Sequence, residues 1–468
     1  MSFVKPCDLR KCEIYIMRKI KREDYKRIFV VALPIILQNV IDSAVNSADV
    51  LMLNSVGQQA ISASSLANSV VGVMFMFLYG IGTGIAMLAA QYYGKGDLKT
   101  IEKIEGIGMK FALTVACIGM LACLFIPKLL MRIFTPEPDL IELGARYLMF
   151  VAPGLIFWAI SSVYMSILRC IGKVATSTIL EGIALVMNVA LNAVLIFGLF
   201  GVPKMGVIGA AVATTLSRMI QFLACLYVSH FRKPGVKLTF KPMFEKHELL
   251  QKDFITMAVP AIANDLVWGL AFTSYSAIIG HLGEDAVAAY SVVNVVRNIG
   301  CIMCYGIGSA AGIIIGQVLG EGEREDAINM GHVMFRLAVY AGILGGLVVL
   351  LVMPFVLRTA NMTDTAVDYL RFMLLVNSYY ITGTSVNTCL IAGVFRAGGD
   401  SKFGFKCDTI DMWCYAVPLG LLAAFVFKFP VKVVYVLLCT DEFVKWPWVL
   451  KHFYSHKWAQ NITRDNVD

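Results

Sequence analysis

The stretch YGIGTGIAMLAAQYYGKGD, residues 79–97, returns as YGIGSAAGIIIGQVLGEGE at residues 305–323. The two stretches coincide at a shift of 226 residues, and the same shift places Pro34 on Pro260. A general excess of apolar residues does not put proline, glutamine and several glycines into one register, so the coincidence indicates an internal repeat. The chain therefore contains two similar halves.

Composition identifies the medium in which both halves fold. The 468 residues are 58% hydrophobic and only 15% charged, whereas soluble proteins are nearer half apolar and a quarter charged. Hydropathy predicts about twelve apolar segments of roughly 20 residues, the length that crosses a bilayer. The expected spans are 28–53, 61–92, 107–127, 147–168, 175–199, 206–229, 255–280, 286–318, 333–357, 370–395, 403–427 and 432–450. We expect an all-α polytopic membrane protein, with twelve transmembrane helices in two pseudo-symmetric six-helix bundles.

The repeat and the spans divide the chain into five parts. They are a basic cytosolic arm at 1–27, an N-terminal bundle at 28–229, a cytoplasmic linker at 230–254, a C-terminal bundle at 255–450 and a cytosolic tail at 451–468. The arm is too long and too charged for a cleaved signal peptide. Most of the 40 Lys and Arg residues lie on the side of both termini. This bias places the termini in the cytoplasm of a multi-pass protein of the plasma or inner membrane, and it gives no reason to expect nucleic acid.

The number of crossings indicates a transporter. Each half crosses six times, so both halves enter the membrane in the same orientation, related by an axis along the membrane normal. Such proteins place substrate and ion sites near the membrane middle and work by rocking one half against the other. The turns GKGD (94–97) and GEGE (320–323) lack the spacing of a phosphate loop and follow no strand. An ATP-driven pump is therefore disfavoured, and we expect no cofactor.

A polar stripe runs along the first helix, although charged side chains inside a membrane are costly. Its members are three or four residues apart and share one helix face: Asn39, Asp42, Asn46 and Asp49. The fifth helix presents a second stripe: Glu181, Asn188 and Asn192. Such side chains face a cavity or one another, and not lipid. We expect a cation-coupling site for H⁺ or Na⁺, with a structural role as the alternative for each member: Asp49, Asp42, Asn188, Asn192 and Glu181.

The second half carries mainly aromatic residues at the equivalent positions. They are Asp265, Trp268, Phe272 and Tyr275 for the first stripe, and Asp408, Tyr415 and Leu419 for the second. Aromatic faces suit a flat or cationic organic molecule, and the aspartates, with nearby Asp411, supply counter-charge. We expect a substrate cavity formed by Trp268, Phe272, Tyr275, Asp265, Tyr415 and Asp408. The alternative is an ordinary helix core.

Other charged residues inside the spans have structural interpretations. Arg218 and Arg297 are expected to be counter-ions to the buried acids. Asp441 and Glu442 are expected to pair with Lys445 near a helix end.

The motifs taken together resemble the multidrug and toxic compound extrusion (MATE) family. They are a proline in helices 1 and 7, ADVLMLNSVG (48–57), YGIG followed by Q..G.G after helices 2 and 8, and FRAGGDSKFG (395–404). The resemblance covers essentially residues 28–450. It implies two six-helix bundles in a V shape and a secondary antiporter that expels organic, often cationic, compounds in exchange for H⁺ or Na⁺. We expect the protein to act as a monomer in the bilayer.

The family's ion sites are kept only in part. Members commonly carry an aspartate fifteen residues after the first-helix proline, and Asp49 stands there after Pro34. One prokaryotic branch adds an Asn-x-x-x-Asp pair on helix 5, where this chain has Asn188 and Asn192. A second branch uses a glutamate on helix 7 and an aspartate on helix 10, where this chain has Trp268 and Ser385. The resemblance thus leaves H⁺ and Na⁺ both open, with Na⁺ at Asp49, Asn188 and Asn192.

Two other functions compete with drug export. The nearer is a flippase for a lipid-linked saccharide, which would favour a strongly cationic cavity, and the sequence offers only Arg218 and Arg297 for it. A membrane enzyme or sensor would need a catalytic constellation or an attached soluble domain, and the sequence shows neither. The substrate itself is not determined by the sequence.

Overall fold

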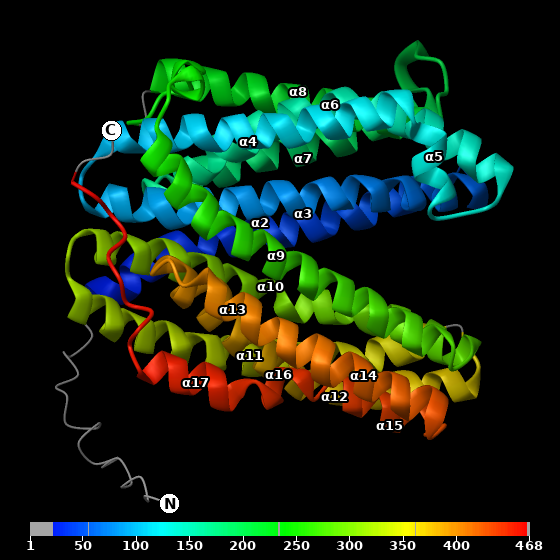
Figure 1. Ribbon diagram of the computed structural model, residues 1–468. Coiled ribbons are helices and arrows are strands. Elements are labelled where there is room, and N and C mark those ends of the chain that lie inside the picture. The colour runs from blue at the N-terminus through cyan, green and yellow to red at the C-terminus, as the bar shows by residue number, and fades with distance from the viewer. Residues whose placement is uncertain (1–21, 55, 233–234, 361, 466–468) are drawn as a thin grey trace, which may run out of the picture.

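The computed structural model describes residues 22–54, 56–232, 235–360 and 362–465, and this part of the chain contains helices and no strand (Figure 1). The first half comprises α2 (Arg22–Asn54), α3 (Gln58–Gly94), α4 (Leu98–Phe125), the short α5 (Pro127–Arg132), α6 (Pro138–Cys170), α7 (Val174–Phe197) and α8 (Val207–Tyr227). The second half begins with α9 (Glu248–Gly280), α10 (Glu284–Gly320), α11 (Arg324–Thr359) and α12 (Asp364–Asn387). The expected fold class is confirmed.

The last three membrane passes of the second half are interrupted. The tenth pass continues from α12 through a π-helical segment, η4 (Thr388–Phe395). The eleventh consists of α13 (Ser401–Asp408), η5 (Thr409–Ala416), α14 (Val417–Leu421) and η6 (Leu422–Val426), and the twelfth of α15 (Val431–Leu438), α16 (Asp441–Val444) and α17 (Trp446–Tyr454). Among the described residues, ten helices are long and apolar enough to span a membrane. Irregular helix at membrane depth is tolerated where it is buried in protein or lines a cavity.

Several helices extend beyond the expected apolar spans, and at α4 a capping residue fixes the start. The third span is expected at 107, yet α4 begins at Leu98. Asp97 precedes it, and the Asp97 side chain accepts a hydrogen bond from the Thr100 backbone amide at 3.1 Å. This N-cap satisfies an amide that the helix leaves free. Hydropathy detects the membrane-embedded part of the helix, and polar capping sets its true start.

The two halves pack on each other through repeat-related contacts. A Cβ on Gly80 would collide with Ile262, and a Cβ on Gly306 would collide with Ile36. The shift of 226 residues that defines the repeat converts one pair into the other. Thus α3 packs on α9 as α10 packs on α2, which is the arrangement that a pseudo-two-fold axis between the halves requires.

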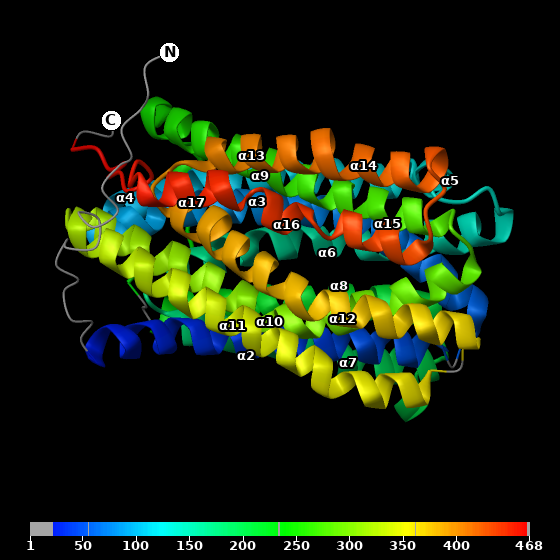
Figure 2. The ribbon, with the colours of Figure 1, turned by 90° about the horizontal axis from the view of Figure 1, so that it is seen from below.

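The halves are tightly joined at one end. Both ends of the described chain, at residues 22 and 465, lie there; we term it the near end, and the opposite one the far end (Figure 1). Gly94 lies against the backbone carbonyl of Gln317, and its repeat equivalent Gly320 lies against that of Gln91. From this contact the two bundles diverge toward the far end (Figure 1), and the view from below shows the helices of both bundles running roughly between these two ends (Figure 2).

Two glutamines add polar contacts at the near end. Gln91 Nε2 donates to the Ala397 carbonyl at 2.7 Å, and Gln317 Nε2 donates to the Cys170 carbonyl at 2.7 Å. These two bonds are again related by the repeat, and both glutamines are buried. The V shape that the resemblance implies is therefore closed by glycine contacts and by two equivalent amides.

The C-terminal segment 455–465 crosses the near end and touches both halves. Gln91 Oε1 accepts a hydrogen bond from the Ile462 amide at 2.8 Å. The Arg464 guanidinium donates to both oxygens of Asp253 on α9, at 2.6 and 2.9 Å. The Arg464 amide also donates to the Tyr92 hydroxyl at 3.1 Å. This segment thus connects α3 of the first half with α9 of the second.

Replacing Gln91 by Leu is expected to lower the free energy of unfolding by about 1–3 kcal/mol. The reason is that buried polar groups that lose their hydrogen-bond partner are desolvated without a compensating bond. The change removes a donor from the Ala397 and Gln460 carbonyls and an acceptor from the Ile462 amide. Thermal unfolding of the purified protein in detergent measures the effect. Gln460→Leu is the matched control, since the side chain of Gln460 is exposed. Equal shifts in both variants would contradict the expectation.

Candidate functional site

A cavity of about 760 Å³ lies between the two bundles. Its wall comes from α2, α3, α6, α7 and α8 of the first half, and from α10 and η4 of the second. The polar residues of the wall include Asp42, Glu181, Asn188, Thr214, Arg218 and Arg396. A concave site between bundled helices, mostly apolar with a few convergent polar groups, is where small ligands bind.

Glu181 on α7 is held by two side chains of α8. Arg218 Nη1 donates to Glu181 Oε1 at 3.0 Å, and Gln221 Nε2 donates to Glu181 Oε2 at 2.5 Å. The Arg218 guanidinium also lies over the Trp158 ring, 5.2 Å from its centroid. The expected role of Arg218 as a counter-ion is confirmed. Because both oxygens of Glu181 already accept hydrogen bonds, Glu181 is a fixed anion compensated by its neighbours.

Asp42 on α2 faces the same cavity with different surroundings. Its side chain is half-buried, and no Lys, Arg or His of the described chain lies within ion-pair distance of it. A carboxylate in this position attracts a cation or a proton, since the membrane interior offers it little compensation. Asp42 is therefore the acid of the cavity that a ligand can reach.

The asparagines of the α7 stripe form a chain of amides behind the cavity wall. Asn188 Nδ2 donates to Thr214 Oγ1 at 3.3 Å, and Asn192 Nδ2 donates to Asn188 Oδ1 at 3.2 Å. Asn188 lines the cavity and Asn192 lies one turn further along α7. Thr214, Ser217 and Gln221 were not predicted from the sequence as part of this site. They share one face of α8 with Arg218 at spacings of three or four residues, and that spacing is the signal that identifies this polar face.

Asp49 belongs to α2, but its side chain lies outside the described residues. Its coupling role stays a prediction, as does Na⁺ binding by Asp49, Asn188 and Asn192. In the part of the chain that the structure describes, no group of three or more His, Cys, Asp or Glu residues is placed to hold a metal ion.

An aromatic wall of the cavity comes from the first half. Phe75 stacks on Tyr79 with ring centroids 5.9 Å apart, and on Trp158 at 5.5 Å. All three line the cavity. From the sequence, aromatic faces were expected in the second half only, although Phe75 and Tyr79 are one helical turn apart on α3.

The six expected substrate residues of the second half lie elsewhere. None of them lines the 760 Å³ cavity within the described chain. Trp268, Phe272 and Tyr275 pack along α9, with successive centroids 4.4 and 5.4 Å apart. Tyr415 shares a hydrogen bond with Thr440 at 3.1 Å. The contact of these residues with a substrate stays a prediction.

The two expected aspartates of the second half are engaged with cations. Asp265 Oδ1 accepts from Arg396 Nη2 at 2.7 Å, and Asp408 Oδ1 accepts from Lys445 Nζ at 3.1 Å. Asp408 is buried, and Asp265 is half-buried. Arg396 itself lines the cavity, so its ion pair places Asp265 of the second half next to the cavity edge.

Comparison with known proteins places this geometry in a family. The MatE family profile matches residues 34–194 and again 260–422, once in each half. The probable multidrug resistance protein NorM of Bradyrhizobium diazoefficiens is 26% identical over 84% of this chain and 85% of its own length. The probable multidrug resistance protein YoeA of Bacillus subtilis is 25% identical, covering 90% and 91%.

Solved structures have the same fold. A crystal structure of MATE in the straight conformation aligns with a TM-score of 0.84 at 18% identity, covering 93% of this chain and 97% of the other. A mutant of the Vibrio cholerae MATE transporter VcmN aligns with a TM-score of 0.84 at 14% identity, covering 93% and 98%. At such identities the likeness shows the fold alone.

Proposed function

Because the chain belongs to the MatE family, we propose that it is a secondary antiporter that exports organic, often cationic, compounds in exchange for H⁺ or Na⁺. Relatives named as probable multidrug resistance proteins support a drug exporter. The observation that carries the coupled mechanism is Asp42, a carboxylate without an ion-pair partner in the described chain, inside a cavity with an aromatic wall. We place the protein in the cell membrane with the near end in the cytoplasm, as the distribution of basic residues favours.

The chemistry follows from competition at the carboxylate. An ionised Asp42 attracts a cationic substrate, whose flat body rests on Phe75, Tyr79 and Trp158 through stacking and cation–π attraction. A proton or Na⁺ arriving at Asp42 cancels that attraction and releases the substrate. Each charge that moves inward across the membrane supplies roughly 2.3 kcal/mol per 100 mV. One coupling ion therefore drives an appreciable substrate gradient.

Alternating access uses the near-end contact as one gate. Gly94 and Gly320 bring the helices together there, while the bundles diverge toward the far end (Figure 1). In this arrangement we expect release at the far side. Uptake from the cytoplasm requires the near end to separate as the far ends approach, in the rocking motion of a two-half transporter.

The test uses purified protein in vesicles loaded with the organic cation ethidium. A pH gradient and a Na⁺ gradient are imposed separately, and ethidium movement is followed by fluorescence. We expect movement under one of the two gradients, which names the coupling ion. Absence of movement under both, in vesicles shown to contain folded protein, would refute the antiport proposal.

One observation favours the flippase as a second candidate. Three arginines line the cavity, namely Arg169, Arg218 and Arg396, where the sequence analysis had suggested only one of them. Two are compensated by acids, since Arg218 pairs with Glu181 and Arg396 with Asp265. The cavity is thus less cationic than a pyrophosphate site would need. Vesicles that move a fluorescent lipid-linked saccharide without an ion gradient, and no ethidium, would establish this alternative.

A further inference from the structure

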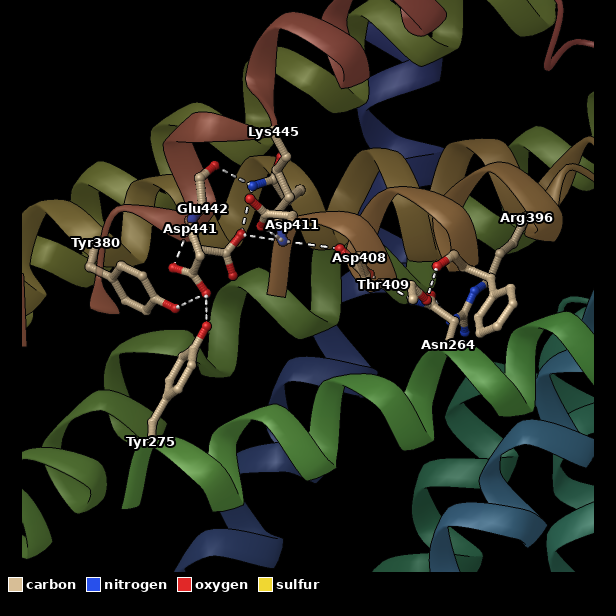
Figure 3. A network of polar contacts seen from close by, with 12 residues as sticks. Asn264, Tyr275, Tyr380, Arg396, Asp408, Thr409, Asp411, Asp441, Glu442 and Lys445 are labelled. Atoms are coloured by element: carbon tan, nitrogen blue, oxygen red, sulfur yellow. Dashed lines mark hydrogen bonds and ion pairs between the residues drawn. The ribbon is translucent and has the colours of Figure 1, made fainter. Parts of the chain in front are cut away.

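A cluster of charged residues is buried where the last two passes of the second half are interrupted (Figure 3). It contains four acids and one lysine, each at most 5% exposed: Asp408, Asp411, Asp441, Glu442 and Lys445. The acids come from the junction of α13 with η5 and from α16, and Lys445 lies between α16 and α17. We term these five residues the Lys445 network.

The repeat relates part of this network to the cavity site. Glu181 and Arg218 of the first half correspond, at a shift of 227 residues, to Asp408 and Lys445 of the second. Both pairs are formed, with N–O distances of 3.0 Å for Arg218–Glu181 and 3.1 Å for Lys445–Asp408. Each half therefore has the same ion pair between its fifth and sixth helices. The first-half pair shares its cavity with Asp42, and the second-half pair lies beside three further acids.

Three of the four acids have hydrogen-bond donors suited to a carboxylate anion. Asp408 accepts from Asn264 at 2.7 Å as well as from Lys445. Asp441 Oδ2 accepts from the hydroxyls of Tyr275 at 3.0 Å and Tyr380 at 3.4 Å. Glu442 Oε2 accepts from Asn387 at 2.6 Å and lies 3.0 Å from Lys445 Nζ. Hydrogen bonds of this kind favour the ionised form.

Asp411 is the exception. It is 1% exposed, and neither of its oxygens accepts a hydrogen bond within the described chain. Its one nearby cation among the described residues is Lys445, whose Nζ lies 3.9 Å from Asp411 Oδ2, at the limit of an ion pair. The titratable groups that interact electrostatically with it are Lys445, Asp441, Glu442 and Asp408, together with Tyr275 and Cys407. An ionised Asp411 here would be a buried charge without adequate compensation, which is costly.

We propose that the Lys445 network is a second proton-binding site, and that Asp411 is the group that takes up and releases the proton. Four ionised acids against one lysine would leave three uncompensated negative charges at membrane depth, and a proton on Asp411 removes one of them. A metal ion fits less well, because the Lys445 ammonium already lies among the carboxylates. The described residues also contain no Asp, Glu, His or Cys group arranged for a metal.

A chain of polar contacts connects this site with the cavity (Figure 3). Arg396, which lines the cavity, donates to Asn264 Oδ1 at 2.8 Å, and Asn264 Nδ2 donates to Asp408 Oδ2 at 2.7 Å. Asp408 in turn holds Lys445. When Asp411 loses its proton, its charge attracts Lys445 away from Asp408, and the change reaches Arg396 through Asn264. Protonation at Asp411 thereby alters the charge that the cavity presents to a substrate.

The local backbone allows such a shift. Asp411 lies in the π-helical η5, and Asp441 and Glu442 lie in the four-residue α16, whereas the equivalent first-half helices α7 and α8 are continuous. Interrupted helices lack the regular hydrogen-bond ladder that would resist a small rotation, and π segments are frequent at functional sites. The inference rests on the proposed antiport only for its role in coupling, since the protonated carboxyl group is observable by itself.

The first measurement is the infrared band of protonated carboxyl groups in the purified protein at neutral pH. We expect Asp411→Asn to remove a component of this band. Asp368→Asn is the control, because Asp368 is 58% exposed and pairs with Lys432, and it should leave the band unchanged. Glu105→Gln should instead remove a component of its own, because Glu105 is as buried as Asp411, its two oxygens also accept no hydrogen bond in the described chain, and it lies outside the cavity lining. Where Asp411→Asn does not fold, Asp411→Glu should shift the component in frequency without abolishing it.

The second measurement is the proton release that ethidium triggers in weakly buffered detergent solution. We expect Asp411→Asn to reduce it to about half, since Asp42 remains as the other group that exchanges protons. Glu105→Gln should release as many protons as the wild type. The proposal would be overturned if Asp411→Asn left the infrared band unchanged. It would also be overturned if the variant lost a component of the band but released as many protons as the wild type, or if Na⁺ removed that component from the wild-type band. Failure of the antiport itself would appear separately, as wild-type vesicles that move no ethidium under either gradient.

Discussion

Asp42→Asn is expected to reduce gradient-driven ethidium export in vesicles at least about tenfold. A tenfold change in affinity corresponds to about 1.4 kcal/mol of binding free energy. Asparagine keeps the shape of the side chain and removes the charge for which substrate and coupling ion compete. Ethidium binding in detergent gives a second readout. It should weaken in the wild type as the pH falls, because protons then occupy the carboxylate. In the variant it should be weak and depend less on pH, because Asp411 then remains as the other proton site.

Two further variants make this expectation specific. Asp368 forms a surface ion pair with Lys432, with N–O distance 2.6 Å and its side chain 58% exposed, so Asp368→Asn should transport as the wild type does. Asp49→Asn tests the aspartate two helical turns further along α2. Loss of transport in Asp49→Asn with normal transport in Asp42→Asn would assign the coupling role to Asp49 and contradict the assignment made from the cavity.

The polar stripes on the first and fifth helices led to the cavity because helix periodicity alone brings such residues onto one face. Asp42, Glu181 and Asn188 all line it, as that periodicity requires. Periodicity gives no information on what stands opposite, so the sequence did not reveal that Gln221 and Arg218 saturate Glu181. Which acid is compensated depends on contacts between helices, and only the packed structure shows them.

In the second half, too, helix periodicity placed residues on a helix face but did not show their contacts with other helices. Translating the stripes by the repeat located Asp408 on the fifth helix of that half, and the expected contact of Asp408 with a substrate stays a prediction. The expectation that Glu442 pairs with Lys445 is confirmed, whereas Asp441 instead accepts from Tyr275. The helix breaks around α16 have a sequence signal that hydropathy does not use, since Thr440 precedes α16 and Pro447 lies in the first turn of α17. Extending the repeat to Arg218 and Lys445 would have indicated the buried network without a structure.

Gly94→Ala is expected to reduce export at least about tenfold through the near-end contact rather than through the cavity. A Cβ at Gly94 would overlap the backbone carbonyl of Gln317, which no side-chain rotation can relieve. Overpacking of this kind costs about 1–3 kcal/mol, and a bias of that size against the closed near end shifts the two-state equilibrium by roughly 5- to 150-fold. The protein would then spend most of its time open at the near end.

Labelling of Cys170 separates this effect from unfolding. Cys170 is buried at the near end, and its carbonyl accepts the Gln317 amide, so a membrane-impermeant maleimide should modify it slowly in the wild type and faster in Gly94→Ala. Gly320→Ala should behave alike, because the repeat places Gly320 against Gln91 in the same way. Gly280→Ala is the control, since a Cβ at Gly280 meets nothing within 4 Å. If Gly94→Ala were to transport normally while Cys170 stayed protected, the gate would have to lie deeper than this contact, among the helix pairs at Gly80 and Gly306.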